Sequence, residues 1–139
     1  MINLSKKTEY GLMALTYLSN LNRGQLANVA EIADSSVIPR ELLAKILSEL
    51  VKAGLAESYS GPSGGFKLAR PAHNVSLSEI IKALENRYGF VNCLTPNSSC
   101  QRSDACKIKA PMARINRKVE NILKETTLND FRTEHINQI

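Results

Sequence analysis

The stretch of sequence that decides the fold runs Gly54-Leu55-Ala56-Glu57-Ser58-Tyr59-Ser60-Gly61-Pro62-Ser63-Gly64-Gly65-Phe66-Lys67-Leu68-Ala69-Arg70. Apolar and polar side chains alternate in residues 55–60 and again in residues 66–70, which is the pattern of strands with one buried face. Glycine, proline and serine fill residues 61–65 between them and are typical of a turn. The stretch therefore predicts a β-hairpin.

Two helices are predicted at the start of the chain. The first begins after Ser5, a good N-cap, and ends at residues 22–24. Its apolar side chains recur at spacings of three and four along one stripe: Tyr10, Met13, Ala14, Tyr17, Leu18 and Leu21. The second is short; Asn28 and Glu31 are spaced to form a capping box at its start, and it ends by Ser36.

A third helix is predicted directly before the hairpin. It opens at Pro39, which suits a first helical turn, and runs to Ala53. Its core stripe consists of Leu42, Leu43, Ile46, Leu47 and Leu50. Two short helices joined by a tight turn and followed by a hairpin form a winged helix-turn-helix, whose second helix enters the major groove of DNA. We therefore expect a mainly α fold with a small β-hairpin wing.

The exposed residues of this third helix and of the wing are the candidates for DNA contact. On the helix they are Pro39, Arg40, Glu41, Ala44, Lys45 and Ser48, with Arg40 and Lys45 first. On the wing they are Ser60, Ser63, Gly64 and Lys67, because glycines let a backbone approach phosphates closely and the other three supply donors. The alternative for the wing is an ordinary tight hairpin.

The charge of the chain agrees with a polyanionic partner. A net charge of +5 and a pI of about 9.2 favour nucleic acid, because cations that neutralise phosphates release counterions; the alternative is a solubilising surface charge. No segment approaches the roughly 18 apolar residues of a membrane span, so we expect a cytoplasmic protein without a membrane partner. No catalytic constellation is visible, and we expect neither an enzyme nor a small-molecule substrate.

The region after the hairpin combines a short helix, a loop and three cysteines. A capping box at residues 76–79 starts the helix, which ends near Asn86. Residues 87–106 show little apolar periodicity and contain Cys93, Cys100 and Cys106. An odd number of cysteines excludes a closed disulfide framework within one chain, and soft thiolates suit an iron-sulfur cluster. Zinc is less favoured because no closely spaced cysteine pair is present, and a thiol-disulfide sensor without metal stays open.

A long helix is predicted at residues 107–126. Apolar side chains recur there at the seam spacing of a helix that packs on a partner helix: Ile108, Met112, Ile115, Val119, Ile122 and Thr126. We interpret it as a dimerisation helix; the alternative is packing on the chain's own body. The predicted organisation is a DNA-binding domain at residues 1–86, a cysteine-bearing loop at 87–106, the dimerisation helix, and a closing turn with a tail at 127–139.

Several segments together resemble the IscR and NsrR type of winged-helix regulators, also called Rrf-type repressors. The segments are residues 4–11, residues 50–55 leading into 61–66, and the three spaced cysteines before a long helix. The resemblance covers nearly the whole chain. It implies a homodimer that binds partly palindromic promoter DNA, a cluster held by the three cysteines, and a response to cluster supply, nitric oxide, oxidation or iron.

The chain also departs from that family pattern. The first cysteine gap is one residue longer than the commonest spacing, and Lys109 stands where IscR-like members have a histidine. Some relatives recruit a carboxylate from the first helix of the other subunit at the position of Glu9, so Glu9 is our hypothesis for the fourth ligand. The alternative for Glu9 is a solvated glutamate favoured by the helix dipole.

The sequence thus predicts a homodimeric transcriptional regulator, acting as a repressor, whose binding to promoter DNA depends on a two-iron or four-iron cluster. Two alternatives remain: a thiol-based redox regulator without a cluster, and an iron-sulfur electron-transfer protein. The second alternative leaves the helix pair and the hairpin without a role.

Overall fold

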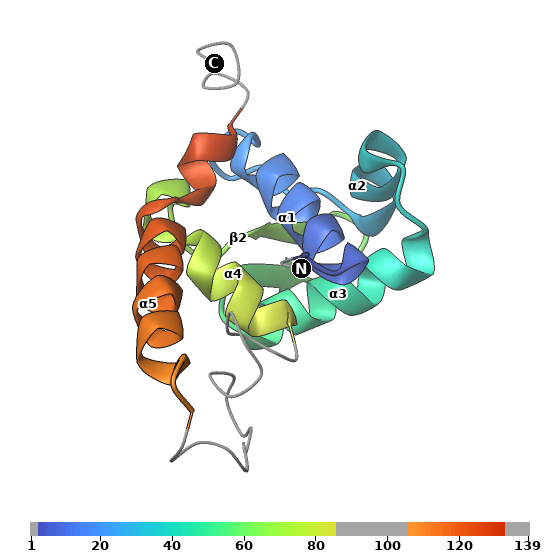
Figure 1. Cartoon of the computed structure of the whole chain (residues 1–139). Helices are drawn as coiled ribbons and strands as arrows, with labels where there is room; N and C mark the ends of the chain where they lie inside the picture. The colour runs from blue at the N-terminus through green and yellow to red at the C-terminus, as the bar shows by residue number, and fades with distance from the viewer. Residues whose placement is uncertain (1–2, 86–105, 133–139) are drawn as a thin grey trace.

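The computed structural model describes residues 3–85 and 106–132 (Figure 1). Four helices and a hairpin come before the first gap: α1 (Lys6–Ser19), α2 (Val29–Ser36), α3 (Arg40–Lys52), β1 (Ala56–Tyr59), β2 (Gly65–Leu68) and α4 (Leu77–Leu84). The short 3-10 helix η1 (Ala72–Asn74) joins β2 to α4. Helix α5 (Lys109–Glu125) and the 3-10 helix η3 (Leu128–Phe131) follow. The fold is mainly α with one antiparallel hairpin, as predicted.

Helices α1, α2 and α4 begin where the sequence predicts. Ser5 and Asn28 each accept a hydrogen bond from the backbone amide three residues further on, at 3.2 and 2.9 Å. Ser76 does the same for the amide of Glu79 at 3.2 Å. The carboxylate of Glu79, however, pairs with Arg70. The capping box predicted at residues 76–79 is therefore only half formed, because a charged partner from the end of the wing competes for its glutamate.

The core lies between α1, α3 and α4. Its leucines include Leu15, which is fully buried although it lies outside the predicted stripe, whereas Met13 and Leu42 are 46% and 37% exposed. The buried face of α1 is rotated toward Leu15 because Gly11 lets α4 approach closely. A Cβ on Gly11 would lie 2.3 Å from the Cδ1 atom of Leu84. Contact between two helices thus overrides the apolar pattern of α1 alone.

A polar link joins the start of α1 to the end of α4. Glu85 accepts hydrogen bonds from the backbone amide of Ser5 at 2.8 Å and from the hydroxyl of the buried Thr8 at 2.7 Å. Burial raises the pKa of the Glu85 carboxyl, but these hydrogen bonds and nearby Lys7 outweigh it, so the pKa is lowered. This link therefore ties the start of α1 to the residue that directly follows α4.

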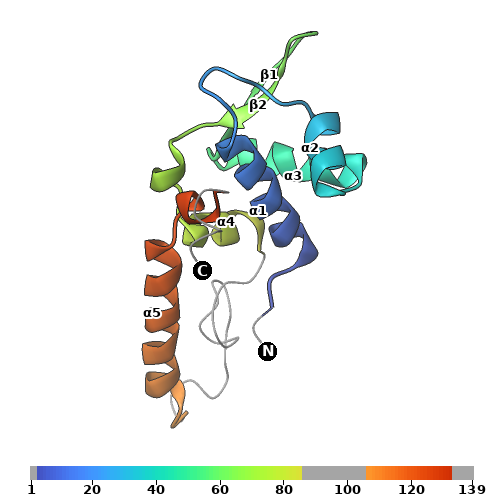
Figure 2. The same cartoon turned by 90° about the horizontal axis from the view of Figure 1, so that it is seen from above.

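The hairpin packs against the segment that precedes α2. Strands β1 and β2 pair from Ala56 with Leu68 to Tyr59 with Gly65. Phe66 exchanges backbone hydrogen bonds with Ala27 at 3.1 and 2.7 Å. A Cβ on Gly65 would lie 2.7 Å from the carbonyl oxygen of Ala27, so this close approach requires glycine. The start of β2 is thereby held beside the segment that leads into α2, as Figure 2 shows from above.

Helix α5 lies along α4 at one side of the molecule (Figures 1 and 2). The ammonium of Lys82 on α4 is 3.0 Å from the carboxylate of Glu120. After α5, the amide of Leu128 donates to the carbonyl of Val75 at 2.8 Å, and the Leu128 side chain is fully buried. The 3-10 helix η3 matches the predicted closing turn. In the described ranges, no helix combines the length and apolar character needed to cross a membrane.

Candidate nucleic-acid interface and cluster ligands

Helix α3 has one buried and one exposed face. Leu43, Ile46, Leu47 and Leu50 are at most 1% exposed and form the core side. The opposite face carries the candidates for base and phosphate contact, all of which are exposed: Pro39, Arg40, Glu41, Ala44, Lys45 and Ser48. In Figure 1, α3 runs along the lower edge of the molecule. The helix therefore presents a largely polar face at the surface.

The two leading cations of this face differ in their surroundings. A terminal nitrogen of Arg40 lies 3.3 and 3.2 Å from the two carboxylate oxygens of Asp34 on α2. Both side chains are more than 60% exposed, so water screens the pair and it stabilises the fold only weakly. Lys45 forms no ion pair with another residue in the described ranges. Of these two cations, Lys45 is thus the one that is ready for a phosphate.

The turn between α2 and α3 has an unusual backbone conformation. Val37 adopts the left-handed region, with φ of 55° and ψ of 50°, and its side chain is 87% exposed. The amide of Ile38 donates to the carbonyl of Ala33 at 3.0 Å, which completes a Schellman-type helix end. Sequence reasoning missed this conformation because the residues that usually signal it, glycine and asparagine, are absent here.

The wing tip shows how its glycines and serines are used. A Cβ on Gly64 would lie 2.1 Å from the carbonyl oxygen of Tyr59, and the amide of Gly64 donates to Gly61 at 3.0 Å. Gly64 is therefore required by the turn itself, and its amide is already used. Ser60 and Ser63 are both exposed at the tip. Their hydroxyls remain the candidate phosphate donors there.

Lys67 lies on β2 beside two side chains of β1. Its ammonium is 5.1 Å from the ring centre of Tyr59 and 3.7 Å from the carboxylate of Glu57. The hydrogen bond and charge interaction with Tyr59, aided by Glu57, raise the pKa of Lys67. Lys67 therefore carries its positive charge on the wing throughout the physiological pH range.

The predicted cluster ligands are only partly within the described residues. Cys93 and Cys100 lie outside them, and Cys106 is a half-buried free thiol just before α5. It lines an open pocket of about 460 Å³ with cationic side chains of α5: Lys109, Arg114 and Arg117. Positive charge around a thiol favours its anionic thiolate form, which is the form that binds metals. Within residues 3–85 and 106–132, no three metal-binding side chains gather in one place.

Glu9, the fourth predicted ligand, lies on the first turn of α1. Its carboxylate is 3.1 Å from the ammonium of Lys6 and its side chain is 41% exposed. It borders an apolar groove of about 490 Å³ that includes Leu12, Met13 and Phe131. Glu9 and Cys106 line separate pockets of this chain.

Comparison with known proteins identifies the family. The pattern of the Rrf2 family, described as an iron-dependent transcriptional regulator, matches residues 4–134. An HTH-type transcriptional regulator of Aquifex aeolicus (strain VF5) is 34% identical over 129 residues, which are 91% of this chain and 89% of the relative.

Two solved structures resemble the fold closely. CymR, the global cysteine regulator of B. subtilis, has a TM-score of 0.79 at 25% identity, covering 96% of this chain and 98% of its own. IscR of T. potens has a TM-score of 0.70 at 25% identity, covering 93% and 85%. The helix-turn-helix, the wing and the family match agree: the chain belongs to the Rrf2 family and is a transcriptional regulator with a DNA-binding winged helix.

Proposed function

We propose that the chain is a homodimeric repressor that binds promoter DNA through α3 and the wing, under the control of an iron-sulfur cluster. The observation that carries the DNA contact is the exposed polar face of α3 beside the wing. Arg40 and Lys45 would meet base edges or phosphates in the major groove. Ser60, Ser63 and Lys67 would hold the phosphates that flank it.

The homodimer is supported by a stripe of isoleucines on α5 and at its N-cap. Ile108, Ile115 and Ile122 are 62%, 41% and 62% exposed and recur every seven residues. Met112 and Val119, from the same predicted seam, are half-buried. The seam is thus divided between the chain's own body and the solvent. An apolar row at the heptad spacing of a coiled coil is best buried by the same helix of a second copy.

The cluster proposal starts from Cys106 and its cationic surroundings. Cys93, Cys100 and Cys106 would supply thiolates, and Glu9 of a second copy would supply an oxygen ligand. An iron-sulfur cluster bound by these residues would supply redox chemistry and an iron open to attack. The chain's own residues would link the start of α5 in one copy to α1 in the other. This link would set the spacing of two α3 helices near one turn of DNA, about 34 Å.

A thiol-based regulator without a cluster is the second candidate. The likeness to CymR, a regulator of cysteine, favours it, as does the free thiol of Cys106. The two candidates share the DNA interface and differ in what the cysteines hold. Iron and sulfide analysis of protein purified without oxygen separates them.

The decisive test is a gel shift with the DNA upstream of the protein's own coding sequence. Lys45→Ala should weaken binding roughly fivefold to 100-fold, since a contact with a charged group is worth about 1 to 3 kcal/mol. Lys118→Ala, an exposed cation on α5, is the matched control and should leave affinity unchanged. Equal affinities for Lys45→Ala and the unaltered protein would reject α3 as the reading helix.

The cluster and its fourth ligand are tested separately. Protein assembled without oxygen should contain iron and sulfide, and Cys106→Ala should lose both. Glu9→Ala should change the absorption spectrum and shorten the life of the cluster in air, whereas Glu125→Ala on α5 should not. An unaltered spectrum and lifetime in Glu9→Ala would reject Glu9 as the ligand without affecting the DNA interface.

A further inference from the structure

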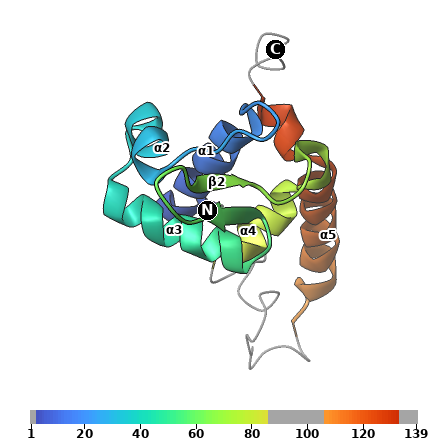
Figure 3. The same ribbon diagram turned by 180° about the vertical axis from the view of Figure 1, so that it is seen from behind.

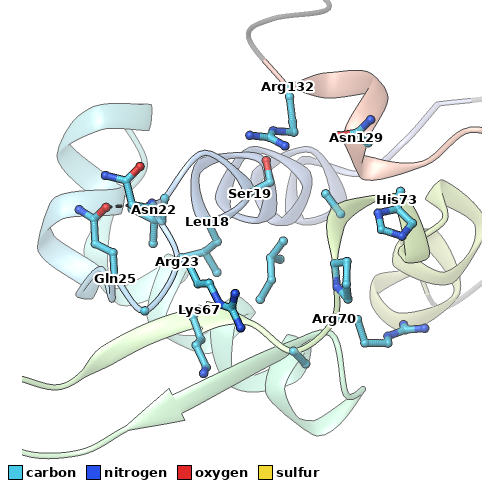
Figure 4. A pocket seen from close by; sticks show the side chains of 16 residues that line it. Leu18, Ser19, Asn22, Arg23, Gln25, Lys67, Arg70, His73, Asn129 and Arg132 are labelled. Atoms are coloured by element: carbon cyan, nitrogen blue, oxygen red, sulfur yellow. Dashed lines mark hydrogen bonds between the residues drawn. The ribbon is translucent and has the colours of Figure 1, made fainter.

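An open pocket of about 450 Å³ lies on the opposite side of the wing from α3. Three stretches that are far apart in the sequence form it: the end of α1 with the following loop, the end of β2 continuing into η1, and η3 with Arg132. Figure 4 shows these segments around the pocket. In Figures 1 and 3, α3 runs along the lower edge of the molecule and η3 lies at the top. The pocket is therefore remote from the DNA-reading face of α3.

The charged side chains that line this pocket are all basic. Arg23, Lys67, Arg70 and Arg132 line it together with His73, and none of the described residues that line it is an aspartate or a glutamate. Arg70 is already paired with Glu79 outside the pocket and donates to the carbonyl of Asn74 at 3.3 Å, and Lys67 is paired with Glu57. Arg23 is exposed and forms no ion pair with another described residue. The pocket thus holds positive charge that the described part of the chain leaves uncompensated.

Arg132 adds an unsatisfied donor. Its Nε atom is shielded from solvent and has no hydrogen-bond partner among the described residues. In Figure 4, its guanidinium is directed back over the C-terminal turn of α1. A buried guanidinium N–H without an acceptor is unfavourable, and an oxyanion is the acceptor that a planar guanidinium binds best.

The rest of the lining limits the size and chemistry of a ligand. Leu18, Leu21 and Leu68 supply apolar surface beside the cations. A pocket of this volume suits a small molecule. The ligand class that matches both features is a small organic acid, with a carboxylate or phosphate at one end and a short apolar body.

We propose that this pocket binds a small organic acid as an effector, with Arg23 and Arg132 supplying its charged contacts. The effector would bridge the base of the wing and η3. Lys67 lies on β2 and Arg70 follows it. Arg132 follows η3, and Leu128 anchors η3 to Val75. Occupancy would therefore alter how the wing is held and hence the affinity for DNA. This role is independent of the cysteines and of what they bind.

The test is a calorimetric titration of the full chain with sodium succinate and with inorganic phosphate, at constant ionic strength set by chloride. We expect saturable binding of at least one probe. Arg132→Gln and Arg23→Gln should each weaken it roughly tenfold or more, the usual loss for one charge-assisted contact. Lys118→Gln, outside the pocket, should change it less than about twofold. Arg23 is in an exposed loop, so its variant remains informative if Arg132→Gln does not fold.

Gel shifts with the same variants separate a free anion from a DNA phosphate. In chloride alone, Arg132→Gln and Arg23→Gln should bind DNA as the unaltered protein does, and a saturating probe should change DNA affinity only when both arginines are present. The proposal is overturned if neither probe binds saturably, or if Lys118→Gln weakens binding as much as the pocket variants. It is also overturned if the pocket variants lose DNA affinity in chloride as Lys45→Ala does.

Discussion

Replacing Val37 with glycine should make the protein more stable, although it removes a side chain. Val37 lies at the end of α2 with φ of 55° and ψ of 50°. The hydrogen bond from the amide of Ile38 to the carbonyl of Ala33 holds this left-handed conformation. The valine side chain is 87% exposed, so its methyl groups gain little from burial. The β-branched side chain therefore costs conformational energy without compensation from packing.

The magnitude follows from two opposing terms. The left-handed region costs an L-residue with a Cβ about 1 to 2 kcal/mol, and a branched residue lies at the upper end. Glycine gives back about 0.4 to 1 kcal/mol of this, because it increases the entropy of the unfolded chain. The expected net gain for Val37→Gly is about 1 to 1.6 kcal/mol, or roughly 3 to 6 °C in Tm for a domain of this size.

Urea and thermal unfolding followed by far-ultraviolet circular dichroism measure this gain. Val37→Ala is the matched control, because it shortens the side chain but keeps the Cβ that the left-handed region disfavours. Its stability should lie between those of the unaltered protein and Val37→Gly. A glycine variant less stable than both would refute the reasoning, since it would mean that the valine side chain contributes packing or that the turn has another conformation.

Three further predictions concern the core, the pH dependence and the DNA face. Gly11→Ala should lower the free energy of unfolding by about 1 to 3 kcal/mol, because its Cβ would lie 2.3 Å from Leu84 Cδ1; an unchanged urea midpoint would contradict this packing. The pKa of Glu85 is lowered because its hydrogen bonds outweigh the effect of burial. The Glu85 carboxylate therefore stabilises the protein above the unfolded pKa of about 4.3, and this stabilisation is lost as the pH falls through the folded pKa. The Tm advantage of the unaltered protein over Glu85→Gln should therefore be present at pH 7 and shrink on acidification to about pH 3.5, and a constant difference would count against it. Asp34→Asn should release Arg40 and raise DNA affinity about 1.5-fold to fivefold at low salt, which is the range expected for an exposed pair. Adding Arg40→Ala to this variant should cancel the gain in a gel shift. A gain that persists without Arg40 would mean that another residue causes it.

The elements that local chemistry determines were predictable from the sequence. Ser5 and Asn28 cap α1 and α2 as expected, because an N-cap acts on an amide only three residues away. The hairpin was predicted for a similar reason, since alternation and turn residues lie within one short stretch. The exposed face of α3 also followed from the spacing of Leu43, Ile46 and Leu47, which are buried.

What the sequence did not reveal depends on partners distant along the chain. Periodicity placed Met13 in the core, but the close approach of α4 at Gly11 turns Leu15 inward instead. The pairing of Phe66 with Ala27 uses backbone atoms and leaves no pattern in the side chains.

The candidate site shows the same division. The residues of α3 were visible as one helical face, whereas the pairing of Arg40 with Asp34 joins two helices and was not foreseen. The basic pocket was also missed, because Arg23 and Arg132 come from opposite ends of the chain. Each is an isolated cation in the sequence, and only the packing of η3 on the domain brings them to one cavity.

The attachment of α5 has a geometric consequence. Leu128 and the hydrogen bonds to residues 75 and 77 secure its C-terminal end, while Cys106 precedes its opposite end. At 1.5 Å per residue, its 17 residues form a rod about 25 Å long. A tilt of about 5° about the secured end would move the other end by about 2 Å. The helix can thus act as a lever arm pivoting at Leu128, so that a small rotation beside Val75 becomes a displacement of about 2 Å at the end that Cys106 precedes.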